Sequence, residues 1–496
     1  MTPVILAFDL GTGGCKAALY WSDGTLVAAT SRFYQTHYPA LGRHEQAPED
    51  WWRAVVGTTR ELLEAGDHDV VAIALSGQSL AVLPLDAGGE LLLERCPIWS
   101  DTRGASQAAV LFESLAEADW YGRTGNGFPS GLYSAFKVMW LRQHAPQVFA
   151  RTRVFIGSKD WINWRLTGRL ATDHSYASGS GVYDLRGRDY DDELLAATGL
   201  TRELWPPIVE GTDLLGGLTA EAARQLGVPA GVPVVCGGVD NSCMAIGAGS
   251  VGDGDFYASL GSSSWLTLTA SQPVLDDAIR PFVFAGAAGH HYHSAVSTFG
   301  AGTSLAWVRD MLLAPDGGSH ERLVKLADCS VAGARGLMFL PTLAGGTSLE
   351  GGPQVRGAYL GLTVAHVQAD LARAALEGVA LALRRALEAL RSLTEVPDHL
   401  LVVGGGAKSA VARQIYADVL GLQVTKTSVD QQAATLGAAA LAAVGVGLWS
   451  DVAQVRDVHQ LVDRHEPDSN HALLYERLLP SFVAASQWHA DLFASR

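Results

Sequence analysis

Three short segments of the chain place a glycine-rich turn directly after a run of apolar residues. The first is residues 4–20, where the apolar run delivers Asp9 into the turn and a second apolar run follows. Residues 256–268 and 400–409 repeat the strand and the glycine turn. Such a turn brings backbone N–H groups against a phosphate, and a carboxylate beside it can hold Mg²⁺. Three such turns predict one nucleotide bound between two related halves of the chain.

The first turn, residues 9–16 (DLGTGGCK), combines a carboxylate, three glycines and a lysine. It is not a dinucleotide-binding GxGxxG fingerprint, because that pattern needs glycine where Lys16 stands. We interpret it as a phosphate loop in which Asp9 acts through Mg²⁺ and its waters while Lys16 supplies a point charge. A plain hairpin turn is the alternative, since Asp and Gly are common there.

The third turn, residues 404–409 (GGGAKS), resembles a P-loop only superficially, because Ala407 precedes Lys408 where the pattern needs glycine. Three glycines after a buried strand remove side chains, so that a flat ring can lie against the backbone. The alternative is an ordinary turn at the entry of a helix.

A second carboxylate stands at another strand end, in residues 236–241 (CGGVDN). Ligands of open α/β sheets bind at such ends. We therefore expect Asp240 to act as a general base for a hydroxyl group, with Asn241 steering the substrate. A helix N-cap is the alternative role of Asp240.

Two polar loops, residues 76–79 (SGQS) and 99–103 (WSDTR), also follow apolar runs. Their amide, indole and carboxylate groups suit a sugar, although either loop could be an ordinary surface loop. His290, His291 and His293 suggest a metal site, but no third ligand of suitable spacing follows, so we disfavour it.

The composition restricts the class of protein. The chain has 496 residues, a net charge of -15, 48% hydrophobic and 18% charged residues, which indicates an ordered protein of more than one domain. The negative charge argues against nucleic acid or an anionic membrane as a partner. Five cysteines without paired spacing and the absence of a signal-like N-terminus predict reduced thiols and a cytoplasmic location. The Ala/Gly-rich residues 433–448 are expected to form a buried helix rather than a membrane span.

Strands and helices alternate along the chain, and a glycine- and aspartate-rich stretch after residue 246 suggests a boundary near 252. We expect two duplicated α/β domains, residues 1–252 and 253–496, around a cleft. The expected strands are residues 4–8, 70–75, 232–239 and 400–403, with hairpin 256–268, and the expected helices are 50–64, 105–116, 369–393, 410–420 and 432–445.

The order of these motifs resembles the FGGY family of carbohydrate kinases, in the actin–hexokinase superfamily, over essentially the full length. The segments that carry the resemblance are FDLGTGGCK at 8–16, LSGQS at 75–79, PIWSDTR at 97–103, GGVDNS at 237–242, SLGSSSW at 259–265, FGAGTSLAW at 299–307 and VVGGGAKS at 402–409. The resemblance implies two duplicated ribonuclease-H-like domains of the actin/hexokinase type flanking a catalytic cleft.

The resemblance also implies roles for single residues, with ATP and Mg²⁺ as cofactors. Asp9 matches the Mg²⁺-linked aspartate and Asp240 the catalytic base. The matching sugar-contact positions are Gln78, Ser79, Trp99, Asp101, Asp240 and Asn241. The matching nucleotide positions are Gly11, Thr12, Gly13 and Lys16 in the first loop, Gly261, Ser262 and Ser263 in the second, Gly302 and Thr303 near the nucleotide, and Gly405, Gly406 and Ser409 at the adenosine.

The chain departs from the pattern of xylulokinase-like members at Ser79-Leu80-Ala81, where they carry Met-His-Gly. The expected activity is phosphorylation of a pentulose, D-xylulose first, with another ketose or polyol (ribulose, a tetritol or glycerol) as the runner-up. An actin-like ATPase acting on protein partners and a sugar-binding regulator are the alternatives from other classes. We also expect a homodimer.

Overall fold

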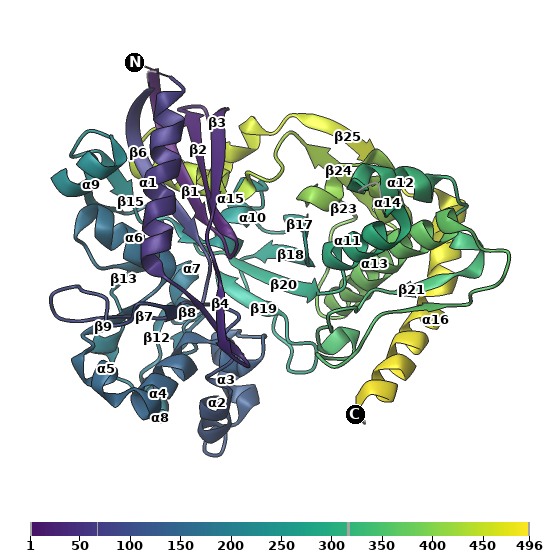
Figure 1. Ribbon diagram of the computed structural model, residues 1–496, viewed down its shortest axis with the longest axis horizontal. Helices are drawn as coiled ribbons and strands as arrows, with labels where there is room; N and C mark the ends of the chain where they lie inside the picture. Colours follow the sequence, from purple (N-terminus) through teal and green to yellow (C-terminus); the bar gives the residue numbers. More distant parts are fainter. Residues whose placement is uncertain (1, 67, 315–317, 495–496) are drawn as a thin grey trace. The chain divides into compact units, whose positions relative to one another are not determined.

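The computed structural model describes residues 2–66, 68–314 and 318–494, and they form two compact units (Figure 1). The first unit comprises Met1–Asp253, Thr269–Ser294 and Gln432–Val458, and the second comprises Gly254–Leu268, Ala295–Gln431 and His459–Arg496. The segments 269–294 and 432–458 lie in the first unit, although the expected division at 252 assigns them to the second domain. Among the described residues, no helix has the length and apolar character needed to cross a bilayer.

The first unit is built on a sheet with the strand order β14-β15-β6-β1-β2-β3, in which β16 also pairs with β6. Strand β1 pairs with β6 in parallel and with β2 in antiparallel fashion. The expected strands 4–8 and 70–75 are confirmed as β1 and β6, whereas the expected strand 232–239 is split into β15 and β16. The strands are β1 (Thr2–Leu10), β2 (Gly14–Trp21), β3 (Leu26–Phe33), β6 (His68–Gly77), β14 (Leu214–Gly217), β15 (Pro233–Val235) and β16 (Gly238–Val239).

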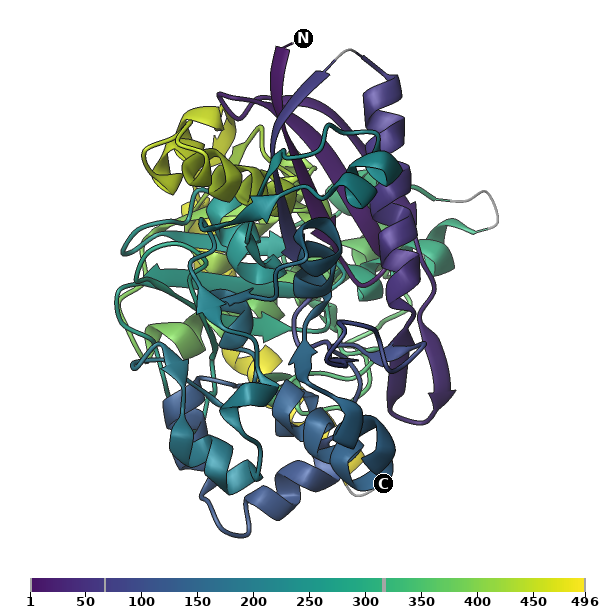
Figure 2. The ribbon, with the colours of Figure 1, turned by 90° about the vertical axis from the view of Figure 1, so that its left-hand side faces the viewer.

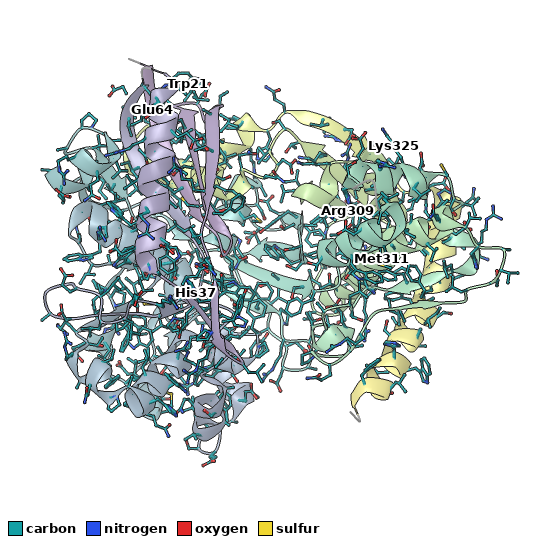
Figure 3. All side chains as sticks on the ribbon, in the orientation of Figure 1. Trp21, His37, Glu64, Arg309, Met311 and Lys325 are labelled. Atoms are coloured by element: carbon teal, nitrogen blue, oxygen red, sulfur yellow. The ribbon has the colours of Figure 1, made fainter. Side chains whose placement is uncertain are left out.

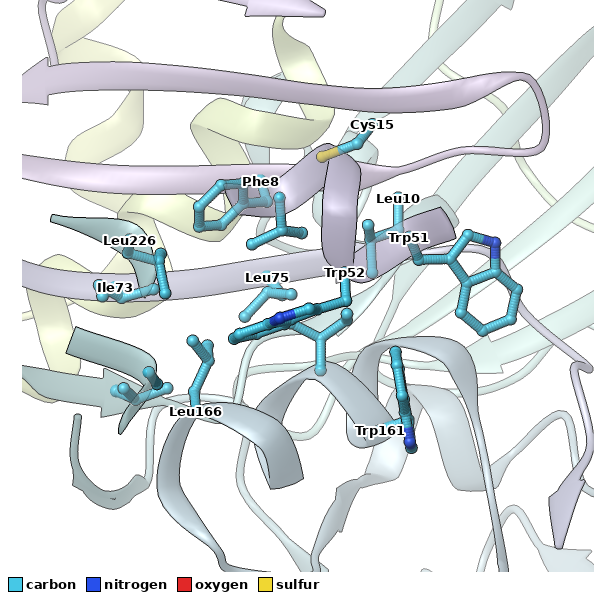
Figure 4. Close-up of a cluster of buried hydrophobic side chains, with 14 of the residues drawn as sticks. Phe8, Leu10, Cys15, Trp51, Trp52, Ile73, Leu75, Trp161, Leu166 and Leu226 are labelled. Atoms are coloured by element: carbon cyan, nitrogen blue, oxygen red, sulfur yellow. The ribbon is translucent and has the colours of Figure 1, made fainter. Parts of the chain in front are cut away.

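Helices cover both faces of this sheet, which explains why β1 and β6 are apolar runs rather than alternating strands. Helices α1 (Pro48–Glu64), α6 (Ser158–Thr167) and α9 (Ala220–Leu226) pack on one face, and α1 is seen along the sheet in Figure 2. Helices α10 (Asp240–Gly247) and α15 (Ala433–Gly445) pack on the other. Figure 4 shows the first face, where Phe8 and Leu10 meet Trp51, Trp52 and residues of α6 and α9.

The rest of the first unit consists of short elements around the lower end of this sheet in Figure 1. The expected helix 105–116 is shorter than predicted, because α2 ends at Leu111 and turns follow. The strands are β4 (His37–Ala40), β5 (Arg43–Gln46), β7 (Leu83–Leu85), β8 (Cys96–Pro97), β9 (Val154–Ile156), β10 (Thr172–Asp173), β11 (Tyr183–Asp184), β12 (Asp189–Tyr190), β13 (Ile208–Val209) and β19 (Phe282–Ala285). The helices are α2 (Ala105–Leu111), α3 (Glu117–Thr124), α4 (Ser134–His144), α5 (Pro146–Arg151), α7 (His174–Ala177) and α8 (Asp192–Thr198).

The second unit repeats the central motif of the first. Strand β17 pairs with β18 in antiparallel and with β23 in parallel fashion, as β1 does with β2 and β6. The expected hairpin 256–268, strand 400–403 and helices 369–393, 410–420 and 432–445 are confirmed. The strands of this unit are β17 (Phe256–Leu260), β18 (Ser264–Ala270), β20 (Tyr292–Thr298), β21 (Met338–Leu340), β22 (Ala358–Leu360), β23 (His399–Val403), β24 (Gln423–Thr427) and β25 (Leu461–His465), and the helices are α11 (Gly302–Leu313), α12 (His320–Asp328), α13 (Gln368–Arg391), α14 (Ala410–Leu420) and α16 (Ser469–Ala494).

Candidate active site

The two candidate catalytic carboxylates follow neighbouring strands of the first unit. Strands β1 and β16 both pair with β6 in parallel, and Asp9 and Gly238 lie in register with the same residue, Ser76. All three strands therefore end at one edge of the sheet. Asp9 at the end of β1, Gln78 directly after β6 and Asp240 directly after β16 are thus gathered at that edge, where ligands of α/β sheets bind.

Asp9 is a buried carboxylate between a hydroxyl group and a lysine. The Ser76 hydroxyl donates to Asp9 Oδ1 at 3.0 Å. Lys16 is the cross-strand partner of Asp9 on β2, and its Nζ lies 3.6 Å from Oδ2 with the side chain half exposed. The loop between them is closed by the Gly11 N–H, which donates to the Gly14 carbonyl at 3.0 Å. A buried negative charge and a half-exposed positive charge thus flank the glycine turn.

Asp240 is the first residue of α10 and is half buried. The pKa of its carboxyl is raised to about 7, chiefly by burial and then by the negative charge of Asp9. The Asn241 N–H, which donates to Oδ1 at 2.8 Å, and the charge of Lys16 act in the opposite direction. The helix N-cap is Val239, so the capping alternative for Asp240 is wrong. A carboxyl group with a pKa near 7 is suited to accept a proton at neutral pH.

A buried network holds the strand that carries Asp240. The Val239 N–H donates to the Ser175 hydroxyl oxygen at 2.9 Å. Asp173 in turn accepts from the Ser175 N–H at 2.8 Å and from its hydroxyl group. The ammonium group of Lys159 lies 2.9 Å from Asp173 and is fully buried. Sequence reasoning missed these residues, whose only signal is a set of charged side chains in apolar surroundings.

The break between β15 and β16 falls at Gly237, which has a φ of +74°. A Cβ atom there would overlap the carbonyl oxygen of Leu75 on β6. Only glycine therefore lets the strand resume beside β6 and deliver Asp240 to the edge.

The expected sugar residues lie on loops around the same edge, and two of them are committed to other contacts. Asp101 is fully buried and accepts from Arg103 Nε at 2.8 Å and from the His44 N–H at 2.7 Å. Its carboxylate therefore orders the loop of residues 97–103. The indole N–H of Trp99 donates to the Thr12 hydroxyl in the first glycine turn at 2.8 Å.

Ser79 and Leu80 are both buried, and Leu80 has a φ of +59° and packs in an apolar cluster. Its carbonyl oxygen accepts from Lys137 Nζ at 3.0 Å, and so does that of Ile98 at 2.7 Å. Lys137 Nζ also donates to the Trp99 carbonyl, at a longer distance of 3.3 Å. Lys137 is fully buried, and this burial lowers its pKa to about 7. Lys137 therefore ties the two sugar-side loops together.

The second unit contains a cavity of about 990 Å³ at the ends of β17 and β23. That volume is enough for a nucleotide. Of the eight expected nucleotide residues in this unit, seven line the cavity: Gly261, Ser262, Gly302, Thr303, Gly405, Gly406 and Ser409. Ser263 is not among the lining residues, and its carbonyl oxygen accepts from the Gly261 N–H at 3.0 Å.

The second glycine turn is joined to the start of α11. The Thr303 N–H donates to the Ser262 carbonyl at 3.0 Å, and a Cβ on Gly302 would overlap the Gly261 carbonyl. The cavity also has lining residues on other helices that sequence reasoning missed: His320, Glu321 and Lys325 on α12, and Tyr416 on α14. Lys325 is labelled on α12 in Figure 3.

Glu350 holds the segment that precedes α11. Its buried carboxylate accepts from the backbone N–H groups of Phe299 at 2.8 Å, Gly300 at 3.0 Å and Thr347 at 3.0 Å. A carboxylate with three N–H donors is firmly fixed, so it positions the backbone just before Gly302.

The described residues contain no group of three or more His, Cys, Asp or Glu side chains that could hold a metal ion by themselves. His293 is buried, and its Nδ1 forms a 2.9 Å hydrogen bond with the Thr269 hydroxyl. Mg²⁺ commonly takes only one or two protein carboxylates and completes its shell with water and substrate phosphates. Asp9 and Asp240, which interact electrostatically, fit that requirement.

Comparison with known proteins identifies the family. Residues 4–247 match the N-terminal domain of the FGGY family of carbohydrate kinases, and residues 256–446 match its C-terminal domain. The chain is 31% identical to the xylulose kinase of Escherichia coli (strain K12) over 497 residues, which cover 99% of this chain and 100% of that one.

Two solved structures have the same TM-score of 0.92 at 27% sequence identity. One is the ligand-bound xylulose kinase from Lactobacillus acidophilus, with 99% of each chain covered, and the other is a gluconate kinase from Lactobacillus acidophilus, with 100% of each chain covered. The architecture is thus shared by kinases that are named for different substrates.

The fold and the site define a two-domain α/β phosphotransferase. The chain belongs to the FGGY family of carbohydrate kinases. It is an ATP-dependent sugar kinase, as the sequence predicted, and not a regulator or an ATPase of protein partners.

Proposed function

We propose that this kinase transfers the γ-phosphoryl group of ATP to the terminal hydroxyl of a pentulose, converting D-xylulose into D-xylulose 5-phosphate. The observation that carries the proposal is the full-length similarity to the xylulose kinase of Escherichia coli, together with a base of suitable pKa at the strand edge. The fold alone does not choose the substrate, because the gluconate kinase structure matches equally well.

The charges of the sugar-side loops favour a neutral sugar over gluconate. A bound carboxylate needs a cation with donors to spare. Arg103 is committed to Asp101 and to Glu45, and Lys137 to backbone carbonyl groups. Arg103 and Lys137 are therefore already engaged, which supports a ketose rather than a sugar acid.

In the proposed mechanism, Asp240 accepts the proton of the attacking hydroxyl group. Its raised pKa makes the carboxylate basic enough for this transfer while it remains substantially ionised above pH 7. Asn241, beside it on α10, orients the sugar. Asp9, with Asp240 near it, would hold Mg²⁺, which when bound neutralises the negative charge of the phosphate oxygens.

We propose nucleotide-binding roles for glycine turns in each unit, taken separately. The first loop offers Gly11, Thr12 and Gly13 with the ammonium group of Lys16, and the cavity of the second unit offers Gly261 to Ser263, Gly302, Thr303, Gly405, Gly406 and Ser409. Backbone N–H groups directed at the transferred phosphoryl group stabilise the charge that develops on it.

We expect relaxed selection among ketoses, because Ser79 and Leu80 stand where xylulokinase-like members have methionine and histidine. Leu80 lies in an apolar cluster. A hydroxyl group that a histidine would read is therefore read less strictly. We expect at least one other ketose or polyol to be phosphorylated at a rate comparable with D-xylulose.

The test is ADP formation with MgATP and a panel of D-xylulose, D-ribulose, L-ribulose, erythritol, glycerol and gluconate, each titrated to give kcat/KM. D-xylulose is expected to give the highest value, with a phosphate ester at C5 by NMR, and Asp240→Asn serves as the inactive control. A higher kcat/KM with gluconate, or with any other member of the panel, would refute the choice of D-xylulose. The expected homodimer, cytoplasmic location and functional boundary at 252 stay predictions.

A further inference from the structure

One buried glutamine lies between loops that the proposed function gives to different substrates. Gln46 ends β5 and is fully buried. Its Nε2 donates to the Thr12 carbonyl at 2.7 Å and to the Thr36 hydroxyl at 2.7 Å. Its Oε1 accepts from Gln78 Nε2 at 2.9 Å and from the Trp51 indole N–H at 2.9 Å. The side-chain amide therefore uses all four of its hydrogen-bonding positions.

The chemistry of the partners fixes which way each amide points. An indole N–H can only donate, so Trp51 requires the oxygen of Gln46 on its side. A backbone carbonyl can only accept, so Thr12 requires the nitrogen on the other side. Because Gln46 Oε1 needs donors, Gln78 must present its NH₂ group to Gln46.

The amide oxygen of Gln78 is consequently turned away from Gln46. It is buried and has no hydrogen-bond partner within residues 2–66, 68–314 and 318–494. A buried acceptor without a donor carries a free-energy cost that a ligand hydroxyl can remove. Gln78 follows β6 at the edge where the sugar is proposed to bind, so its oxygen is a ready acceptor for a sugar hydroxyl.

The Thr12 residue of the phosphate loop is held from both sides by sugar-side residues. Its carbonyl oxygen accepts from Gln46, and its hydroxyl oxygen accepts from Trp99. The Gln78 N–H also donates to the Leu10 carbonyl at 2.8 Å, just before the loop. Hydrogen bonds in such a chain strengthen one another in a buried setting.

We propose that Gln46 is a positioning residue that couples sugar binding to nucleotide binding. A sugar hydroxyl that donates to Gln78 Oε1 orders the Gln78 amide, and Gln46 transmits this order to the Thr12 carbonyl and so to the phosphate loop. The sugar therefore raises the affinity for nucleotide, and the nucleotide raises the affinity for sugar by the same factor, because coupling is reciprocal. The inference rests on the proposed sugar and phosphate roles of these loops, but not on which sugar is the substrate.

The test measures the dissociation constant of the Mg²⁺ complex of a non-hydrolysable ATP analogue, with and without saturating sugar, by calorimetry. The sugar is the best substrate of the panel above, so a failure of D-xylulose as the substrate leaves this experiment intact. For the unmodified enzyme, the ratio of the two constants is expected to be roughly 5 to 150, the usual range of such coupling.

Two variants and one control test the hydrogen bonds of this chain separately. Gln46→Glu keeps both acceptor contacts but loses the donors to Thr12 and Thr36, and it should bring the ratio close to 1. Gln225→Met is the matched control, because Gln225, on α9, also accepts from an indole of α1, that of Trp52 at 2.7 Å, but donates to neither Thr12 nor Thr36. It should leave the ratio unchanged. Thr12→Val, at a half-exposed position, removes only the bond from Trp99 and should lower the ratio in part.

A structural role alone would lower stability without changing the ratio, so thermal unfolding is measured for each variant. If Gln46→Glu fails to fold, Trp51→Phe decides: it removes the indole donor that holds the Gln46 amide oxygen and leaves Thr12 unaltered, so it should lower the ratio, and an unchanged ratio in it would overturn the proposal. An unmodified enzyme whose ratio is 1, or a folded Gln46→Glu that keeps the full ratio, would overturn the proposal.

Discussion

The acid side of the pH–rate profile should report Asp240 directly. Its pKa is raised to about 7, chiefly by burial and then by Asp9. The ionised form accepts the proton, so activity is lost as the pH falls through about 7. At pH 6, one unit below that value, about a tenth of Asp240 is ionised, and kcat/KM for the sugar should be about a tenth of its plateau. An exposed aspartate, with a pKa near 3.9, would keep nearly full activity at that pH.

Two charged neighbours of Asp240 shift its pKa in opposite directions. Asp9 raises its pKa, so Asp9→Asn should move the acid limb to lower pH. Lys16 lowers it, so Lys16→Met should move the limb to higher pH. Both variants also reduce the rate and, for Asp9→Asn, the response to Mg²⁺, but the position of the limb is independent of the size of the plateau.

The assay is kcat/KM for D-xylulose at MgATP far below its KM, from pH 5.5 to 9, so that the limb reports the enzyme before the nucleotide and Mg²⁺ bind. A neutral sugar does not titrate, so the limb belongs to the enzyme. Intrinsic fluorescence at each pH excludes unfolding as the cause. A profile that is flat down to pH 5.5, or two variants that shift the limb in the same direction, would refute the assignment of Asp240 as the base.

Four further changes test the positioning of the site. Asp240→Asn should lower kcat by roughly 10²–10⁴-fold, and because a raised carboxyl pKa makes the ionised form costly above pH 7, it should also raise Tm at pH 8; a kcat near that of the unmodified enzyme would remove Asp240 from the mechanism. Gly237→Ala should destabilise the enzyme far more than Gly231→Ala, because both glycines have positive φ but only Gly237 faces a backbone carbonyl; equal losses in urea unfolding would contradict this. Lys137→Met leaves buried carbonyl groups without a donor and should cost about 1–3 kcal/mol in urea unfolding and raise KM for the sugar, whereas unchanged stability would deny its role. Glu350→Gln, which replaces an acceptor oxygen with NH₂, should raise KM for ATP and leave KM for the sugar unchanged; the reverse pattern would count against its role at the nucleotide segment.

The strands and glycine turns of the site could be predicted from the sequence, because each depends on residues that are close together in the chain. An apolar run followed by glycines is visible without any tertiary information, so the strands that carry Asp9 and Gly261 were predictable. The long helix α13 was equally clear, because its apolar positions extend around most of the circumference. The split of 232–239 was not foreseen, since it depends on the contact of Gly237 with β6.

The supporting residues could not be predicted, because their partners lie far away in the chain. Gln46 meets Gln78 from 32 residues away, and Ser175 meets Val239 from 64 residues away. Glu350 reaches Gly300 over 50 residues. Nothing in a local pattern distinguishes such a side chain from a solvated one; burial does, and burial is a property of the whole fold.

Helix α15 has a consequence for how the protein is made. It packs on β1 and β6, and its Thr435 hydroxyl forms a 2.7 Å hydrogen bond with the Tyr20 hydroxyl, 415 residues earlier. At usual rates of synthesis, the ribosome needs about 20 to 90 s to reach α15 after β1 has emerged. During that interval the face of the first sheet that contacts α15 lacks this helix. A nascent chain of this kinase therefore exposes apolar surface for most of its translation. A polypeptide that ends at residue 252 should bind chaperones rather than fold as an independent domain.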